Sequence, residues 1–247
     1  TTAVGMADWK NQADIEFVFP VVWCHTRCKV QSITREGDRA VVAMLQPQFS
    51  QARKKEGVHV DAPSSVENAL ELLDEPGEWY LDRTAKTVYY KPLPGQDMSK
   101  VRVTAPSVEK LVELRGTLDR PVANLRFEGL VFADAGWLQP SEAGLVDVQA
   151  NFVVNAHKPL TRDDALTAVH NEQLKSPANV VCHAATGIRF ERCTFTRLGG
   201  AGIDIESGSQ STLISGCRFF DISGSAVQIG DVLTDDHHPD DPRKIVR

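Results

Sequence analysis

The sequence lacks a long apolar run and an excess of basic residues. No stretch approaches the roughly 20 apolar residues of a transmembrane helix, so we expect no membrane span. The 27 lysine and arginine residues are outnumbered by 33 aspartate and glutamate residues, which leaves a formal net charge of −6. This charge argues against a nucleic-acid partner and, without a local basic patch, disfavours a polyanionic polysaccharide.

Cysteine is also scarce and odd in number. The five cysteines give no disulfide framework, and the Cys24-His25-x-x-Cys28 segment lacks a second cysteine or histidine pair for zinc. We therefore predict no metal and no other cofactor. The first residues show neither the charged nor the apolar region of a signal peptide, and no N-glycosylation sequon occurs. The residues themselves thus give no positive evidence of export.

A repeat is present between Gly187 and Gly230. The shift that places Cys193 on Cys217 also aligns five further pairs, which are Phe195/Phe219, Leu198/Ile222, Gly200/Gly224, Ile203/Val227 and Ile205/Ile229. Short alternating apolar segments between small turns are typical of strands with one buried face. Such strands bury a core only when successive copies stack, so the repeat predicts the coils of a right-handed parallel β-helix.

The first half of the chain has a different pattern. Strands are predicted within Ile15–Met44, in a hairpin over Glu78–Tyr90 and at Leu111–Leu114, and a short helix is predicted at Ser65–Leu73. A partial coil follows at Leu125–Ala135, with Phe127 over Phe190 and Phe132 over Phe195. The predicted fold is therefore all-β, with a β-rich (barrel- or sandwich-like) domain at residues 1–118 and β-helix coils at residues 119–247.

The run from Glu67 to Gly116, which contains PGEWYLDR and VYY, resembles bacterial right-handed β-helix proteins of the glycoside-hydrolase type. The segment PVANLRFEGLVFADAGW after it extends this resemblance, which covers about Asp8 to Arg247 and points to fucosidase- and xylanase-type β-helix enzymes. In that family a small β-rich domain is inserted between early coils. The resemblance implies a pectin-lyase-like fold, hydrolysis of a polysaccharide or glycan, and a secreted or periplasmic location.

The same resemblance implies that the chain is an internal piece of a longer enzyme. The family's acidic motifs, of the Asp-Gly-Gly-x-Ile-Tyr and Tyr-x-Asp-x-Gly-Ser kinds, are absent from this sequence. They are expected in later coils, and the first coils are expected before this chain. The remainder of its own polypeptide is therefore an expected partner, beside the carbohydrate substrate.

Outward residues of the repeat supply the candidate catalytic groups. If the isoleucines of Ile203–Ile205 point inward, then Asp204 and Glu206 point outward about 6.5–7 Å apart. Two such carboxyls suit acid and base or nucleophile roles in glycoside hydrolysis. His183 on the preceding coil is expected to contact Glu206, and Gln228 lies on the following coil. Asp204 and Glu206 are thus predicted catalytic residues, with His183 and Gln228 as substrate-binding residues.

Asp231–Asp241 is the densest cluster of potential ligands. Its spacing matches neither a calcium loop nor a zinc motif, so Asp231 and His237 are predicted to contact sugar rather than metal. Two alternatives stay open at this point. Outward polar residues on stacked coils are often only solvated, which would leave a non-catalytic carbohydrate-binding or structural module. A polysaccharide lyase is disfavoured, because the outward residues Asp204, Glu206 and Gln228 are acidic or neutral.

Overall fold

The computed structural model describes residues 2–21, 24–46, 48–54, 62–138, 152–154, 173–231 and 239–247. The chain folds as two compact units. The first holds the described residues up to Val103, and the second holds most of those from Thr104 onward.

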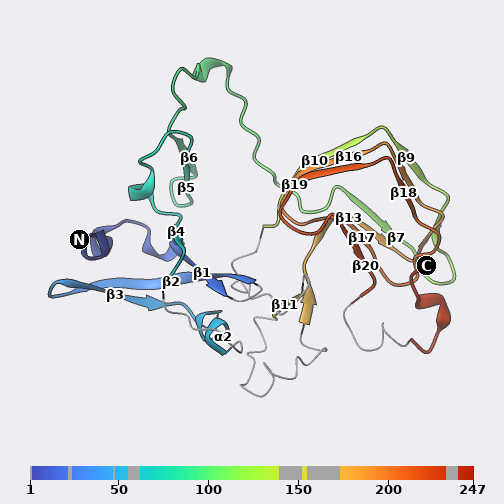
Figure 1. Ribbon diagram of the computed structural model, residues 1–247, viewed down its shortest axis with the longest axis horizontal. Coiled ribbons are helices and arrows are strands. Elements are labelled where there is room, and N and C mark those ends of the chain that lie inside the picture. The colour runs from blue at the N-terminus through green and yellow to red at the C-terminus, as the bar shows by residue number, and fades with distance from the viewer. Residues whose placement is uncertain are drawn as a thin grey trace. The chain divides into compact units, whose positions relative to one another are not determined.

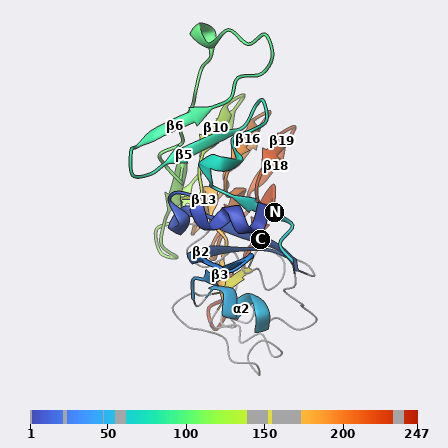
Figure 2. The same ribbon diagram turned by 90° about the vertical axis from the view of Figure 1, so that its left-hand side faces the viewer.

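The first unit is built on an antiparallel sheet with the strand order β3-β2-β1-β4. The four strands are β1 (Glu16–Val21), β2 (Cys24–Glu36), β3 (Arg39–Met44) and β4 (Ser65–Glu67). Gly37, at a φ of 61°, takes the left-handed conformation that the tight turn between β2 and β3 requires. Helix α2 (Gln48–Lys54) lies against β2, as Figure 2 shows. Ile15, Phe17, Cys28 and Val30 form the centre of the core.

The remaining elements of this unit are short. They are α1 (Thr2–Gly5), the 3-10 helices η1 (Met6–Asp8), η2 (Gln12–Asp14), η3 (Leu70–Leu72) and η4 (Met98–Lys100), and the hairpin β5 (Trp79–Asp82) and β6 (Thr87–Tyr90). The predicted helix at Ser65–Leu73 is wrong. Residues 65–67 pair with β1 instead, and Asn68 at a φ of 63° interrupts any helix before the single turn of η3.

The second unit consists of three parallel sheets, whose strands come from successive coils of the chain. Neighbouring strands within each sheet are parallel and in register. The first sheet contains β7 (Val112–Arg115), β13 (Ala178–His183), β17 (Ala201–Ile205) and β20 (Val227–Ile229). The second contains β9 (Arg126–Glu128), β15 (Arg189–Glu191) and β18 (Leu213–Ser215), and the third contains β10 (Val131–Ala135), β16 (Thr194–Leu198) and β19 (Arg218–Ile222).

Figure 1 looks along these coils, and the three sheets form three walls around one interior. Short pairs complete the unit: β8 (Val122–Ala123) with β14 (Ala185–Thr186), and β11 (Phe152–Val154) with β12 (Gln173–Lys175). A 3-10 helix, η6 (Pro242–Lys244), follows. The chain is therefore nearly all β, as predicted, and its parallel strands stack coil on coil.

The predicted register of the coils is confirmed. Phe190 pairs with Phe127, and Phe195 pairs with both Phe132 and Phe219. Their rings stack at centroid distances of 5.0 Å for Phe127–Phe190, 4.8 Å for Phe132–Phe195 and 4.6 Å for Phe195–Phe219. These ladders occupy the buried interior together with aliphatic residues such as Ile203. The repeat thus sets the core of the unit.

The corner between the second and third walls is a tight turn in each coil. Gly129, Arg192 and Gly216 occupy this corner, and all three have left-handed φ values of 66°, 53° and 63°. Glycine tolerates this conformation at little cost, whereas Arg192 adopts it against its preference. Successive coils therefore turn with the same backbone geometry at this corner, which fits the constant register of their strands.

The strand at Leu111–Leu114 is expected from the sequence to belong to the N-terminal β-rich domain. The structure instead places β7 in the first wall, where Val112 pairs with Val180 and Leu114 pairs with Cys182. The first compact unit holds the described residues up to Val103, and β7 belongs to the second. The reason is that β7 is a complete strand of the first coil, although no repeat in the sequence marks it.

Candidate functional site

The candidate site is the outer face of the first wall, β7-β13-β17-β20. Asp204 pairs with Val181 on one side and with Gln228 on the other, and His183 pairs with Arg115. Because Ile203 and Ile205 are buried in the interior, the intervening polar side chain points to the outer face. The predicted alignment of polar residues across the coils is therefore confirmed.

Asp204 is nevertheless not a solvated groove residue. Its side chain is only 4% exposed, and Lys175 of β12 contacts its Oδ1 atom. Burial raises the pKa of Asp204 to about 6, against the lowering effect of Lys175 and with smaller raising effects from Glu206 and Asp231. The expectation of an open carboxylate at this position is wrong, because Lys175 from outside the repeat caps it. The catalytic role assigned to Asp204 stays a prediction.

Lys175 connects three oxygen atoms of this wall. Its ammonium contacts Asp204 Oδ1 and the carbonyl oxygen of Gly230, and it lies 3.8 Å from Asp231 Oδ1. The second oxygen of Asp231, Oδ2, accepts a hydrogen bond of 2.7 Å from the backbone amide of Ser207. Asp231 therefore lies beside the predicted wall, but its oxygens are engaged by protein groups. Lys175 provides the positive charge that the buried carboxyl of Asp204 needs.

Gln228 is buried in the same row. Its Nε2 atom donates to Ser176 Oγ at 3.2 Å. Its Oε1 atom is buried and has no hydrogen-bond partner within the part of the chain that the structure describes. Gln228 is therefore not an open sugar contact in this conformation, and its role in substrate binding stays a prediction.

The open part of the wall is formed by Glu206, His183 and Arg115. His183 Nδ1 lies 3.2 Å from Glu206 Oε2, which confirms the predicted contact, and Arg115 Nη1 lies 3.6 Å from the same oxygen. The side chains of Glu206 and His183 are 19% and 38% exposed. With its proton on Nδ1, His183 donates to Glu206 and keeps Nε2 as a hydrogen-bond acceptor. The three side chains together offer a carboxylate, an imidazole and a guanidinium at the surface.

Sequence reasoning missed Arg115 and Lys175. Arg115 was hidden because the strand that carries it was expected in the other domain, although the alternation of Glu113 and Arg115 matches that of Val181 and His183. No sequence pattern pointed to Lys175, because β12 follows a segment outside the repeat. The predicted contact residue His237 lies outside the described residues.

Two cysteines are buried thiols, Cys28 in the core of the first unit and Cys182 in the core of the second. Burial raises the pKa of both Cys28 and Cys182 to about 12, with an added raising effect from nearby carboxylates. Both thiols are therefore held protonated and pack in the cores. Within the described ranges, no three histidine, cysteine or acidic side chains lie together in a way that could hold a metal ion.

We expect Asp204 to make the second unit less stable as pH rises. Its pKa is about 6 in the folded chain against an ordinary 3.8, so its contribution to stability is full below pH ~4 and is lost as pH rises through 6. At about 1.4 kcal/mol per pH unit of pKa change, the loss is about 3 kcal/mol. The free energy of unfolding of Asp204→Asn, measured by denaturation at pH 4 and pH 7, should not show this loss. An exposed control, Asp221→Asn, should keep the wild-type pH dependence, and equal profiles for both variants would contradict the assignment.

Known proteins are similar to this chain in two ways, one over the first unit and one over nearly the whole chain. Residues 2–93 match the family of the GH141 insertion domain. A solved structure titled "Glycoside hydrolase" is similar to 95% of this chain, with 31% sequence identity and a TM-score of 0.78. The chain spans 43% of the length of that protein. No curated protein matches the chain.

The family match falls within the β-rich first unit, and the structural match extends through the stacked coils. No helix in the described part of the chain is long and apolar enough to cross a membrane.

Proposed function

We propose that the chain is part of a glycoside hydrolase that acts on a polysaccharide or glycan. The observation that carries this proposal is the 31% identity with a glycoside hydrolase over 95% of the chain. The match of residues 2–93 to the GH141 insertion domain supports it independently of the coils. Because the chain spans 43% of that relative, we assign part of the catalytic machinery to the remainder of a longer polypeptide.

Within this chain, Glu206 is the carboxylate best placed to meet a sugar. Its side chain is partly exposed, and His183 and Arg115 flank the same oxygen. Charged and planar side chains of this kind hydrogen-bond sugar hydroxyls. Asp204, two residues away, is enclosed by Lys175 and has no comparable access. The proposed sugar contact is therefore Glu206 with His183 and Arg115.

The finer fold and the location belong to the same proposal. The parallel pairing of all three walls supports a right-handed parallel β-helix of the pectin-lyase-like type. The resemblance to fucosidase- and xylanase-type β-helix enzymes supports a bacterial protein that is secreted or periplasmic. A glycan outside the cytoplasm is then the substrate.

Hydrolysis of a glycan panel tests this function. We expect new reducing ends from the longer polypeptide that contains this chain, and Glu206→Gln should lower kcat/KM by about tenfold to hundredfold, the value of a charged hydrogen bond. Glu128→Gln on another wall is the matched control and should leave kcat/KM unchanged.

Three results would contradict the proposal. Unsaturated products that absorb in the ultraviolet would identify a lyase instead. Glycan binding without any hydrolysis by the longer polypeptide would identify a binding module. Equal losses in Glu206→Gln and Glu128→Gln would remove Glu206 from the sugar contact.

A further inference from the structure

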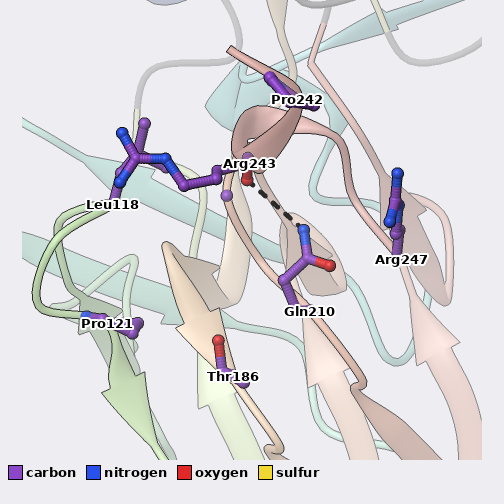
Figure 3. Close-up of a pocket in the computed structure, with 8 residues that line it drawn as sticks. Leu118, Pro121, Thr186, Gln210, Pro242, Arg243 and Arg247 are labelled. Atoms are coloured by element: carbon purple, nitrogen blue, oxygen red, sulfur yellow. Dashed lines mark hydrogen bonds between the residues drawn. The ribbon is translucent and has the colours of Figure 1, made fainter.

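The second unit also contains a cavity. It has a volume of about 360 Å³ and lies beside the short β8-β14 pair, and Figure 3 shows the side chains that line it. Its size is at the lower end of the range for small-molecule sites, which suits one sugar ring rather than a long chain. Neither the sequence pattern nor the comparisons assign a role to it.

One side of the cavity is a ladder of polar side chains from successive coils. Thr186 and Gln210 are parallel bridge partners. The backbone amide of Arg247 donates to Ser209 O at 3.2 Å, and Ser211 N donates to Arg247 O at 2.6 Å, which places Arg247 opposite Gln210. Neighbouring strands lie about 4.8 Å apart, so a hydroxyl, an amide and a guanidinium follow one another on one face.

The two arginines of the cavity differ in their pairing. Arg243 donates to Asp241 Oδ2 at 2.6 Å and to Asp119 Oδ1 at 2.9 Å, so two carboxylates neutralise it. The guanidinium of Arg247 has no ion-pair or hydrogen-bond partner within the described ranges. Figure 3 shows the two side chains on opposite sides of Gln210. The two arginines and the two aspartates balance in formal charge, and Arg247 is the arginine whose guanidinium donors are left for a ligand.

The amide nitrogen of the Gln210 side chain is already hydrogen-bonded within the protein. Its Nε2 atom donates to the carbonyl oxygens of Ile245 and, at 3.4 Å, Arg243, which fixes the side chain and the η6 segment against the ladder. Its Oε1 atom stays available as an acceptor for a ligand hydroxyl. The cavity thus presents a fixed acceptor beside a guanidinium with unused donors.

Apolar side chains line the rest of the cavity, beside the paired guanidinium of Arg243. They belong to Leu118, Pro121 and Pro242. Gly208 faces Leu118, where a Cβ atom would come within 2.8 Å of Leu118 Cδ2, and its φ of 77° also excludes most side chains. An apolar surface beside a polar ladder matches a sugar ring, which has apolar C–H faces and a polar hydroxyl edge.

We propose that this cavity binds a single sugar residue that carries an oxyanion, either a carboxylate or a sulfate. The guanidinium of Arg247 holds the oxyanion through paired hydrogen bonds, and Thr186 with Gln210 Oε1 holds hydroxyls. The choice of a sugar as the ligand rests on the proposed function. The site also refines the inference from net charge: the chain has a formal charge of −6, but the guanidinium of Arg247 gives an acidic sugar a cationic group to pair with.

Binding titrations by isothermal calorimetry and by backbone NMR shifts test this site on the chain itself. Glucuronate and glucose 6-sulfate are compared with glucose as the neutral probe. We expect at least one anionic sugar to bind about tenfold more tightly than glucose, because a charged hydrogen bond to arginine is made only with the oxyanion. Arg247→Gln should remove this preference, with NMR shifts at Thr186 and Gln210 reduced. Arg218→Gln, an exposed arginine on β19, is the matched control and should keep the preference.

The results distinguish a carboxylate from a sulfate ligand, and they test the cavity separately from the proposed hydrolase function. Preference for glucuronate identifies a uronic acid, and preference for the sulfate identifies a sulfated sugar. Equal binding of all three probes, or a preference that survives Arg247→Gln, would overturn the site. Anionic-sugar binding here without hydrolysis by the longer polypeptide would uphold the site and refute the hydrolase. Hydrolysis by the longer polypeptide with no anionic-sugar binding here would support the hydrolase and refute the site.

Discussion

Replacing Phe190 with alanine is expected to destabilise the second unit by about 3–5 kcal/mol, the cost of emptying a buried aromatic site. Phe190 is fully buried, and its ring lies 5.0 Å from that of Phe127 and 6.0 Å from that of Phe195. It therefore contacts rings of two walls at once, so the cavity removes contacts from two aromatic ladders. The coils on either side are held in their own register and have little freedom to collapse into the space.

Chemical denaturation followed by circular dichroism measures this loss. Hydrogen exchange at the amides of β9, β15 and β18 assigns it to the second unit rather than to the first. Phe220→Ala, at a half-exposed position on β19, is the control and should cost well under 1 kcal/mol. A Phe190→Ala variant as stable as Phe220→Ala would mean that the stacked coils are not the stabilising core.

The core of the second unit could be predicted from the sequence because every coil places its residues in the same way. An inward position in one coil lies above the same position in the next, so Phe195 and Phe219 are recognisable from the sequence alone, and their rings stack. The contact of His183 with Glu206 followed from the same rule, since it needs only the register and the strand spacing. Periodicity therefore carries information about any pair that two repeating coils supply.

The rest of the candidate site depended on residues outside that rule. Lys175 comes from β12, which pairs with β11 and has no counterpart in the repeat. Arg115 comes from the first coil, whose β7 shares the register but not the recognisable sequence spacing. Burial of an outward residue is set by what covers the wall, and the repeat contains no information about that cover.

Asp204 and Glu206 illustrate the consequence. They are two residues apart on one outer face, so the sequence pattern makes them an equivalent pair. In the structure Asp204 is enclosed beneath Lys175, whereas Glu206 stays partly exposed between His183 and Arg115. The two carboxyls differ greatly in their exposure to solvent, which is why Glu206, and not Asp204, is the carboxyl of the proposed sugar contact.

Replacing Lys175 with methionine is expected to destabilise the second unit by about 3–5 kcal/mol at pH 8, because it leaves a buried carboxylate without its cation. Lys175 contacts Asp204 Oδ1 and the carbonyl oxygen of Gly230, and both contacts are lost together. Methionine keeps most of the length and apolar stem of lysine, so the charge is the main change. Lys110→Met, at a partly exposed lysine paired with Glu113, should cost no more than about 1 kcal/mol.

The pH dependence and a double substitution identify Asp204 as the cause. Since the pKa of Asp204 is already about 6 with Lys175 present, removing the lysine raises it further. Denaturation should therefore show a smaller cost of Lys175→Met at pH 5, where Asp204 is protonated, than at pH 8. Adding Asp204→Asn to Lys175→Met should recover much of the loss at pH 8, because no uncompensated charge then remains. A cost that is equal at both pH values, or a double variant no more stable than Lys175→Met alone, would show that Lys175 stabilises the wall through its packing and its contact with Gly230 instead.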